Sequence, residues 1–123
     1  MMTILGRGMD SRLFTEVREK HGLVYGISSS FNDWQGGGLS LVEFSTRDQN
    51  VSSALDIVND QIEDIKTNLC TDEEVQRAKN KMRSSFYAAI EDSYSMCYWG
   101  VKQRLFGTPS IEQYMDNIDS VTS

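Results

Sequence analysis

Basic charge and long apolar runs are scarce in this 123-residue sequence, and each shortage excludes a class of protein. Lys and Arg number 12 against 18 Asp and Glu, which gives a net charge of −6. This charge argues against a protein that binds nucleic acid through a basic face. No apolar run approaches the roughly 18 residues of a membrane span. The first residues as they stand lack the basic region and long apolar core of a signal peptide. We expect neither a nucleic-acid nor a membrane partner.

Histidine is represented only by His21, which limits metal and nucleophilic chemistry. A catalytic zinc takes about three protein ligands, and the chain offers no second histidine and no paired cysteines near His21. We therefore expect no metal and no cofactor bound by this chain alone. The strained Gly-x-Ser-x-Gly turn of many hydrolases is also missing, which argues against a hydrolytic triad.

The two cysteines, Cys70 and Cys97, are too few for a disulfide framework. Free thiols in a reducing compartment are the favoured interpretation, with a single disulfide as the alternative. This favours a cytoplasmic location.

The chain fits one domain, or a large piece of one. Its 39% hydrophobic and 24% charged residues are ordinary for a globular protein. Met1–Leu5 begins inside an apolar run, and Val121–Ser123 directly follows a helical pattern. We therefore expect residues 1–123 to form a single partial domain.

The first half of the chain predicts a helix followed by a hairpin. A helix begins at Asp10 or Ser11 and ends at Gly22, since glycine suits the left-handed cap conformation. Its apolar stripe consists of Leu13, Phe14 and Val17. Residues 23–31 alternate as a strand, with Tyr25, Ile27, Ser29 and Phe31 on one face. A turn at 32–38 and a second strand at 39–46 complete an antiparallel pair.

The second half predicts helices. A long helix from about Asp48 has apolar residues at three- and four-residue steps up to Leu69. Thr71 and Glu74 form a capping box for the next helix, and further helices follow at 94–107 and from Ser110. The aromatic residues in the predicted helix at 94–107 favour core or interface packing, with the lining of a substrate cavity as the alternative. These residues are Tyr94, Tyr98 and Trp99.

This order of elements predicts a two-layer α+β domain, in which helices pack on one face of an antiparallel sheet. Two strands alone make a poor sheet, so we expect further strands upstream of Met1. The exposed hairpin edge also predicts homo-oligomers formed by strand pairing.

Arg18 and Tyr25 stand seven residues apart across the predicted helix end. A guanidinium and a tyrosine hydroxyl are both hydrogen-bond donors at neutral pH. In one cleft they would hold a peptide carbonyl or stabilise the oxyanion formed on attack. The alternative is purely structural, with Arg18 as a surface helix residue and Tyr25 as a half-buried strand residue.

A family resemblance bears on this choice. Residues 5–25 read LGRGMDSRLFTEVREKHGLVY, which resembles the non-zinc half of the pitrilysin and mitochondrial-processing-peptidase family. The family segment reads roughly L-G-G-G-M-S-S-R-L-F-x-E-[IV]-R-E-K-x-G-L-[AV]-Y. Arg7 stands where the family often has glycine, and His21 stands where arginine or glutamine is common. The similarity continues through TDEEVQRAKN at 71–80 and IDSVT at 118–122.

The resemblance implies a zinc metallopeptidase built from paired, similarly folded halves. One half carries zinc on the motif H-x-x-E-H, whose glutamate is the general base. The other half supplies an arginine and a tyrosine to the peptide substrate, and Arg18 and Tyr25 match these positions. The implied partners are thus a zinc-bearing domain or subunit and a peptide, and the chain would be inactive alone. Some family halves are catalytically silent, so the alternative is a non-catalytic binding or assembly module.

Overall fold

The computed structural model describes residues 1–34 and 36–122. Gln35, within the predicted turn, and Ser123, the last residue of the predicted domain, lie outside the described residues. The chain divides into two compact units, Met1–Cys70 and the segment from Thr71 onward. Each unit is described by itself.

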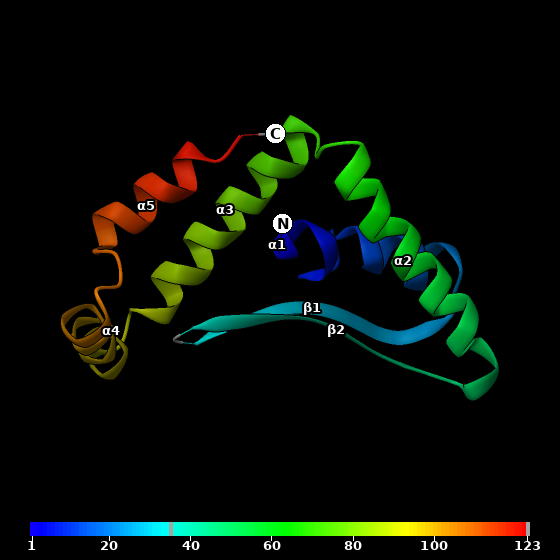
Figure 1. The fold of residues 1–123 in the computed structure, drawn as a ribbon, viewed down its shortest axis with the longest axis horizontal. Coiled ribbons are helices and arrows are strands. Elements are labelled where there is room, and N and C mark those ends of the chain that lie inside the picture. Colours follow the sequence, from blue (N-terminus) through cyan, green and yellow to red (C-terminus); the bar gives the residue numbers. More distant parts are fainter. Residues whose placement is uncertain (35, 123) are drawn as a thin grey trace. The chain divides into compact units, whose positions relative to one another are not determined.

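The first unit is a long hairpin with helices on one side. Its elements are α1 (Met2–Gly6), η1 (Phe14–Lys20), β1 (Val24–Trp34), β2 (Gly37–Thr46), η2 (Asp48–Asn50) and α2 (Val51–Thr67). Figure 1 shows α1 and α2 on the same side of the antiparallel pair β1–β2. Both strands are longer than predicted and extend into the expected turn, where Trp34 pairs with Gly37. Gly36 has a φ of 92°, which favours glycine at this tight turn.

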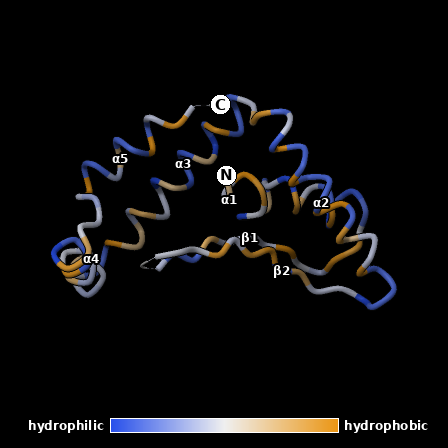
Figure 2. The backbone as a smooth tube through the Cα atoms, viewed as in Figure 1, coloured by the Kyte–Doolittle hydropathy of each residue, from blue (hydrophilic) through white to orange (hydrophobic). Residues whose placement is uncertain are grey.

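The core of this unit lies between the helices and one face of the hairpin. Leu13, Val17 and Ala54 are fully buried, each with an exposed fraction of 0%. They pack in one cluster with Val24 and Ile27 of β1. The predicted apolar stripe of the first helix is therefore confirmed. Figure 2 shows hydrophobic residues recurring among hydrophilic ones along α2. Val58 is buried, and Ile62 and Ile65 pack on the same cluster, in keeping with the predicted three- and four-residue spacing. The helix ends at Thr67, however, and Leu69, the last residue of the predicted spacing, is 71% exposed.

The first helix departs from an ordinary α-helix. Residues Phe14–Lys20 are wound as a π-helix, whose wider turn adds about one residue to each hydrogen-bonded ring. The helix ends at His21, and Gly22 follows with a φ of 60°. The predicted role of Gly22 as the terminating residue is confirmed.

A β-bulge interrupts the start of β1. Val24 pairs with Thr46 and Gly26 with Ser45, so Tyr25 is an extra residue without a partner on β2. The predicted alternation placed Tyr25 on the face of Ile27, which is wrong. The bulge turns Tyr25 away from that buried face, and its exposed fraction is 64%. The half-buried strand position of the structural alternative is wrong for the same reason.

Close packing of α1 on β1 at Gly6 leads to a stability prediction. A Cβ added at Gly6 would lie 2.8 Å from the backbone nitrogen of Ser29, so the backbone would have to shift. We expect Gly6→Ala to destabilise the protein by about 1–3 kcal/mol in urea unfolding. Gly100 is a matched control, because a Cβ there meets no atom within 4 Å. Gly100→Ala in a helix interior should instead stabilise by up to about 1 kcal/mol, and equal effects would contradict the prediction.

The second unit consists of the helices α3 (Asp72–Ala89), α4 (Ser93–Phe106) and α5 (Ile111–Ser120). The capping box of Thr71 and Glu74 is confirmed, because each residue's backbone N–H donates to the other's side chain. Asp92 caps α4 by accepting from Ser95, and these hydrogen bonds hold the pKa of its carboxyl below the ordinary value. Ser110 begins α5, as predicted.

The aromatic residues of the second unit do not form one lining. Trp99 packs edge-on against Phe86 at 4.9 Å between ring centroids, and Tyr114 stacks on Phe86 at 4.4 Å. Tyr94 and Tyr98 stack on each other but are mostly exposed. Trp99 therefore packs, half-buried, against other rings of this unit, as the packing interpretation predicted. For Tyr94 and Tyr98, interface packing stays a prediction.

Together these elements are α+β, with a two-stranded antiparallel sheet and helices, so the predicted fold class is confirmed. The single partial domain remains a prediction. Cys70 and Cys97 are both free thiols. Among the described helices, none has the length and apolarity to cross a membrane.

Candidate functional site

Arg18 lies on η1 with its side chain exposed. Its guanidinium carbon sits 4.7 Å from the centroid of the Phe14 ring, which is cation–π distance. The stacking leaves the edge of the guanidinium, with its N–H donors, free for another group. π-Helical turns are frequent at functional sites, and Arg18 lies inside one.

The turn after η1 fixes the chain between Arg18 and Tyr25. The Arg18 carbonyl accepts from the Gly22 N–H at 3.0 Å, and the Val17 carbonyl accepts from the Leu23 N–H at 3.0 Å. The Leu23 carbonyl in turn accepts from the Thr46 hydroxyl and, at 3.3 Å, from the Asn50 amide. These bonds anchor the start of β1 to η1, to the end of β2 and to the residue that precedes α2.

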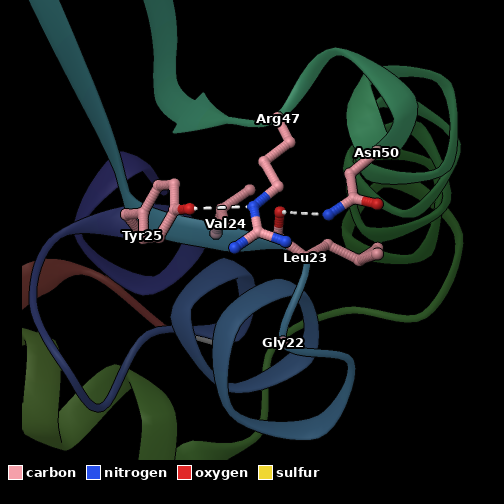
Figure 3. A pocket seen from close by; sticks show the side chains of 6 residues that line it. All are labelled: Gly22, Leu23, Val24, Tyr25, Arg47 and Asn50. Atoms are coloured by element: carbon pink, nitrogen blue, oxygen red, sulfur yellow. Dashed lines mark hydrogen bonds between the residues drawn. The ribbon is translucent and has the colours of Figure 1, made fainter.

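The Tyr25 hydroxyl is held by an arginine, but not by Arg18. The Nε–H of Arg47 donates to the Tyr25 hydroxyl oxygen at 3.1 Å (Figure 3). Because the tyrosine oxygen accepts this bond, its own proton is free to donate outward. Arg47 follows the last residue of β2, so the hairpin brings it beside the start of β1.

A small hollow opens at this corner (Figure 3). It is lined by Gly22, Leu23, Val24, Tyr25, Arg47 and Asn50. Its volume is about 200 Å³, below the roughly 300–1,000 Å³ of typical small-molecule pockets. The hollow can therefore accept one chemical group of a larger ligand, such as part of a peptide.

The structure thus places the two predicted site residues in one unit, on either side of Gly22, but shows no contact between them. Among the described residues, the Tyr25 hydroxyl has Arg47 as its hydrogen-bond partner, and the Arg18 guanidinium has the Phe14 ring. Arg47 was not among the residues predicted from the sequence. A signal was present, because pairing the predicted strands brings the residues after position 46 level with the start of the first strand.

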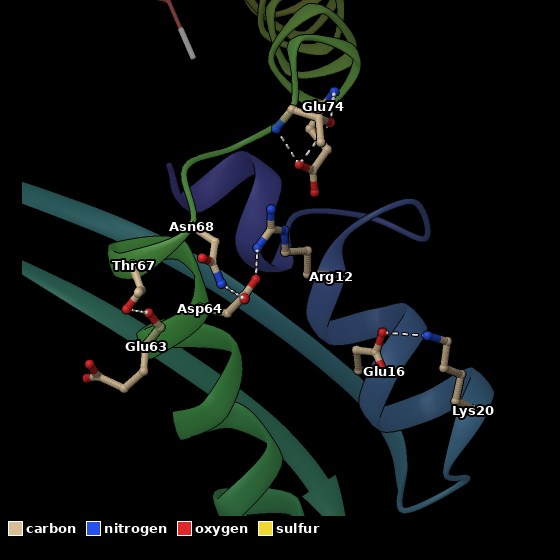
Figure 4. Close-up of polar contacts among 9 residues, drawn as sticks. Arg12, Glu16, Lys20, Glu63, Asp64, Thr67, Asn68 and Glu74 are labelled. Atoms are coloured by element: carbon tan, nitrogen blue, oxygen red, sulfur yellow. Dashed lines mark hydrogen bonds and ion pairs between the residues drawn. The ribbon is translucent and has the colours of Figure 1, made fainter.

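Ion pairs hold η1 and α2 in place around this corner (Figure 4). Arg12, just before η1, binds Asp64 of α2 at 2.6 Å, and its side chain is only 15% exposed. Lys20 binds Glu16 one turn earlier at 2.6 Å. The Nδ1 atom of His21 is 2.8 Å from the Glu16 carbonyl oxygen, so the His21 ring is hydrogen-bonded to the backbone of η1.

Zinc does not fit the residues present. Within positions 1–34 and 36–122, no group of three or more His, Cys, Asp and Glu side chains is arranged to hold a metal ion. Arg47 offers only N–H groups and a positive charge, whereas zinc is held by lone pairs of histidine nitrogen, thiolate sulfur or carboxylate oxygen. The described residues of this chain therefore do not form a zinc site.

The fold places the chain among α+β proteins in which helices cover one face of an antiparallel hairpin. Comparison with known proteins then gives the family, because residues 1–82 match the model of the peptidase M16 inactive domain. The match covers more than half of the chain, so the chain belongs to this family. The resemblance of residues 5–25 to the non-zinc half of a peptidase is thereby confirmed.

Relatives and solved structures agree with this assignment. An uncharacterized zinc protease of Streptomyces coelicolor is 34% identical over 98% of this chain. The crystal structure of a peptidase M16 inactive domain from Pseudomonas fluorescens matches with a TM-score of 0.83 and 28% identity over 98% of this chain, and over 29% of that chain. A conserved protein of Enterococcus faecalis, at 24% identity and a TM-score of 0.87 over 98% of this chain and 28% of its own, supports the fold alone. The chain spans only 27% of the Streptomyces relative's length.

Proposed function

We propose that this chain is part of the substrate-binding, non-zinc half of a zinc metallopeptidase, in which Arg18 and Tyr25 hold the carbonyl of a peptide. A zinc-bearing domain or subunit completes the site, and the chain is inactive alone. Arg18 and Tyr25 serve as donors to the carbonyl oxygen and to the oxyanion that forms when the carbonyl is attacked.

The exposed, pre-positioned hydroxyl of Tyr25 carries this proposal. The bulge turns Tyr25 out of the sheet, and Arg47 occupies the hydroxyl oxygen, so the remaining proton is available for a ligand. A donor that is fixed before the substrate arrives costs little reorganisation when charge develops. Arg18 supports the same function, because its guanidinium rests on Phe14 and no carboxylate of the described chain neutralises it.

The alternative, a non-catalytic binding or assembly module, needs no role for this pair. One sequence observation separates the two functions: the motif H-x-x-E-H in the same protein or in a partner subunit. If the motif is present, the peptidase hypothesis holds, and Arg18 and Tyr25 can be tested by mutation in the complete enzyme. Without it, the enzyme function is contradicted and the binding module remains.

The Arg18→Ala variant of the complete, zinc-loaded peptidase tests the role of Arg18. We expect kcat/KM to fall about ten- to a hundredfold, because one donor to the oxyanion is lost. Steady-state hydrolysis of a fluorogenic peptide measures this effect. Lys66→Ala is the control, since it removes one positive charge from a surface pair with Glu63 on α2 and should change kcat/KM less than twofold. Equal rates for wild type and Arg18→Ala would contradict the catalytic role.

A further inference from the structure

We propose that Arg47 and Tyr25 form a carboxylate-binding subsite, so that the peptidase prefers peptides with a carboxylate close to the carbonyl held by Tyr25. The carboxylate is either an acidic side chain or the C-terminus of the peptide. This inference rests on the proposed function for the identity of the ligand as a peptide. It goes beyond that function because it assigns a role to Arg47 and a preference to the substrate.

The geometry of Arg47 points to a carboxylate. Its Nε–H is used by the Tyr25 hydroxyl, which fixes the plane of the guanidinium. The two terminal nitrogens, Nη1 and Nη2, have no hydrogen bond or ion pair with any described residue. Their parallel N–H bonds match the two oxygens of a carboxylate, which is the planar, two-point recognition at which arginine exceeds lysine.

Arg47 combines an uncompensated charge with a place on the wall of the hollow. Arg7, Arg18 and Arg104 also lack a carboxylate partner among the described residues, but none of them lines this hollow. The protein has a net charge of −6, and its carboxylates neutralise other arginines. Arg12 pairs with Asp64, Arg77 with Glu73, and Arg83 with Asp119. Arg47 has no such partner among the described residues, although Asp48 is its neighbour in sequence. Its positive charge is therefore available to a ligand.

The hollow has room for the group in question. Its volume of about 200 Å³ compares with roughly 30 Å³ for one water in the liquid, so a carboxylate and its adjoining carbons can enter. The Tyr25 hydroxyl lies on the wall of the same hollow. A peptide whose carbonyl oxygen accepts a hydrogen bond from the Tyr25 hydroxyl thus brings a neighbouring carboxylate within reach of Arg47.

Matched peptides test the subsite with the complete peptidase. One fluorogenic peptide carries Asn or Gln throughout and a C-terminal amide. A second set replaces one position at a time by Asp or Glu, and a third peptide has a free C-terminal carboxylate. We expect wild-type kcat/KM to be about tenfold higher than for the neutral peptide when the carboxylate stands at one particular position. A rise within the Asp and Glu set indicates a side-chain carboxylate, and a rise with the third peptide indicates the C-terminus. The preference should shrink as ionic strength rises.

Arg47→Gln should abolish this preference, so that neutral and acidic peptides have the same kcat/KM. Because the variant also loses the hydrogen bond that holds the Tyr25 hydroxyl, kcat/KM for the neutral peptide is expected to fall as well, and the readout is the ratio between the two peptides. The control Arg7→Gln removes the same charge from an exposed residue that does not line the hollow, and it should keep the preference. The same peptides are also bound to chelator-treated enzyme and followed by fluorescence anisotropy, so that the Kd values report on the subsite without turnover.

Two outcomes would overturn the inference. The first is a wild type that shows no carboxylate preference in either assay. The second is an Arg47→Gln variant that lowers kcat/KM and affinity by the same factor for neutral and acidic peptides, so that the preference remains. The proposed function fails separately. If Arg18→Ala and Tyr25→Phe leave turnover of the neutral peptide unchanged while Arg47→Gln still removes the carboxylate preference in binding, the subsite stands and the carbonyl-binding role is wrong.

Discussion

A Tyr25→Phe peptidase is expected to fold normally and to lose about two to three orders of magnitude in kcat, the usual effect of removing one oxyanion donor. The substitution removes a single oxygen from a side chain that is 64% exposed. The Tyr25 hydroxyl bonds to Arg47 at an exposed position, so the free energy of unfolding should change by less than about 0.5 kcal/mol. A donor that acts on the transition state affects kcat and kcat/KM alike, and KM should stay nearly constant.

Tyr94→Phe provides the matched control for this experiment. Tyr94 is 80% exposed on α4 and stacks on Tyr98 through its ring, which phenylalanine retains. Steady-state kinetics on both variants should show the loss only for Tyr25→Phe. A Tyr25→Phe enzyme that raises KM and keeps wild-type kcat would mean that Tyr25 binds substrate uniformly and does not stabilise the oxyanion.

The elements that sequence patterns predicted well are those whose signal is local. The capping box of Thr71 and Glu74 needs only three residues of chain and is confirmed. Gly22 is confirmed as the end of the first helix because the left-handed conformation it adopts penalises other residues. Leu13 and Val17 followed from helical spacing, which depends on the chain's own geometry and not on its partners.

The positions of the two site residues were harder to predict, since each depends on an irregularity of the backbone. A π-helix around Arg18 differs from an α-helix by one residue per turn, and the apolar spacing of Leu13, Phe14 and Val17 does not distinguish them. The bulge at Tyr25 breaks a two-residue alternation that continues normally from Ile27 onward. Neither irregularity changes the local spacing of apolar residues, so the sequence pattern contains no signal for it.

Arg47 shows a different limit of sequence analysis. Its contact with Tyr25 follows from strand register, which was available once two strands and a turn were predicted. Arg47 also lies outside residues 5–25, 71–80 and 118–122, which carry the family resemblance. A hydrogen bond between residues 22 positions apart is apparent only when the hairpin is closed.

Leu13→Ala should have the largest effect on stability, about 3 kcal/mol of unfolding free energy. Leu13 is fully buried at the start of the first helix and packs in the cluster with Val17, Val24 and Ala54. Removing its side chain loses the transfer free energy of three carbons and leaves a cavity that its neighbours fill only in part. Because Val17 and Val24 flank the Gly22 turn, the site between them should loosen before the rest of the protein unfolds.

Hydrogen exchange measured by mass spectrometry resolves this effect by segment. Peptides from η1 and β1 should exchange about a hundredfold faster in Leu13→Ala, which corresponds to roughly 3 kcal/mol at 1.4 kcal/mol per factor of ten. Peptides from α3 and α5 serve as an internal reference, because the chain divides into two compact units at Thr71. Leu69→Ala is the matched substitution, since Leu69 is 71% exposed, and its exchange should equal wild type. Equal protection of β1 in Leu13→Ala and Leu69→Ala would contradict this prediction. It would mean that the buried cluster does not stabilise the segment between Arg18 and Tyr25.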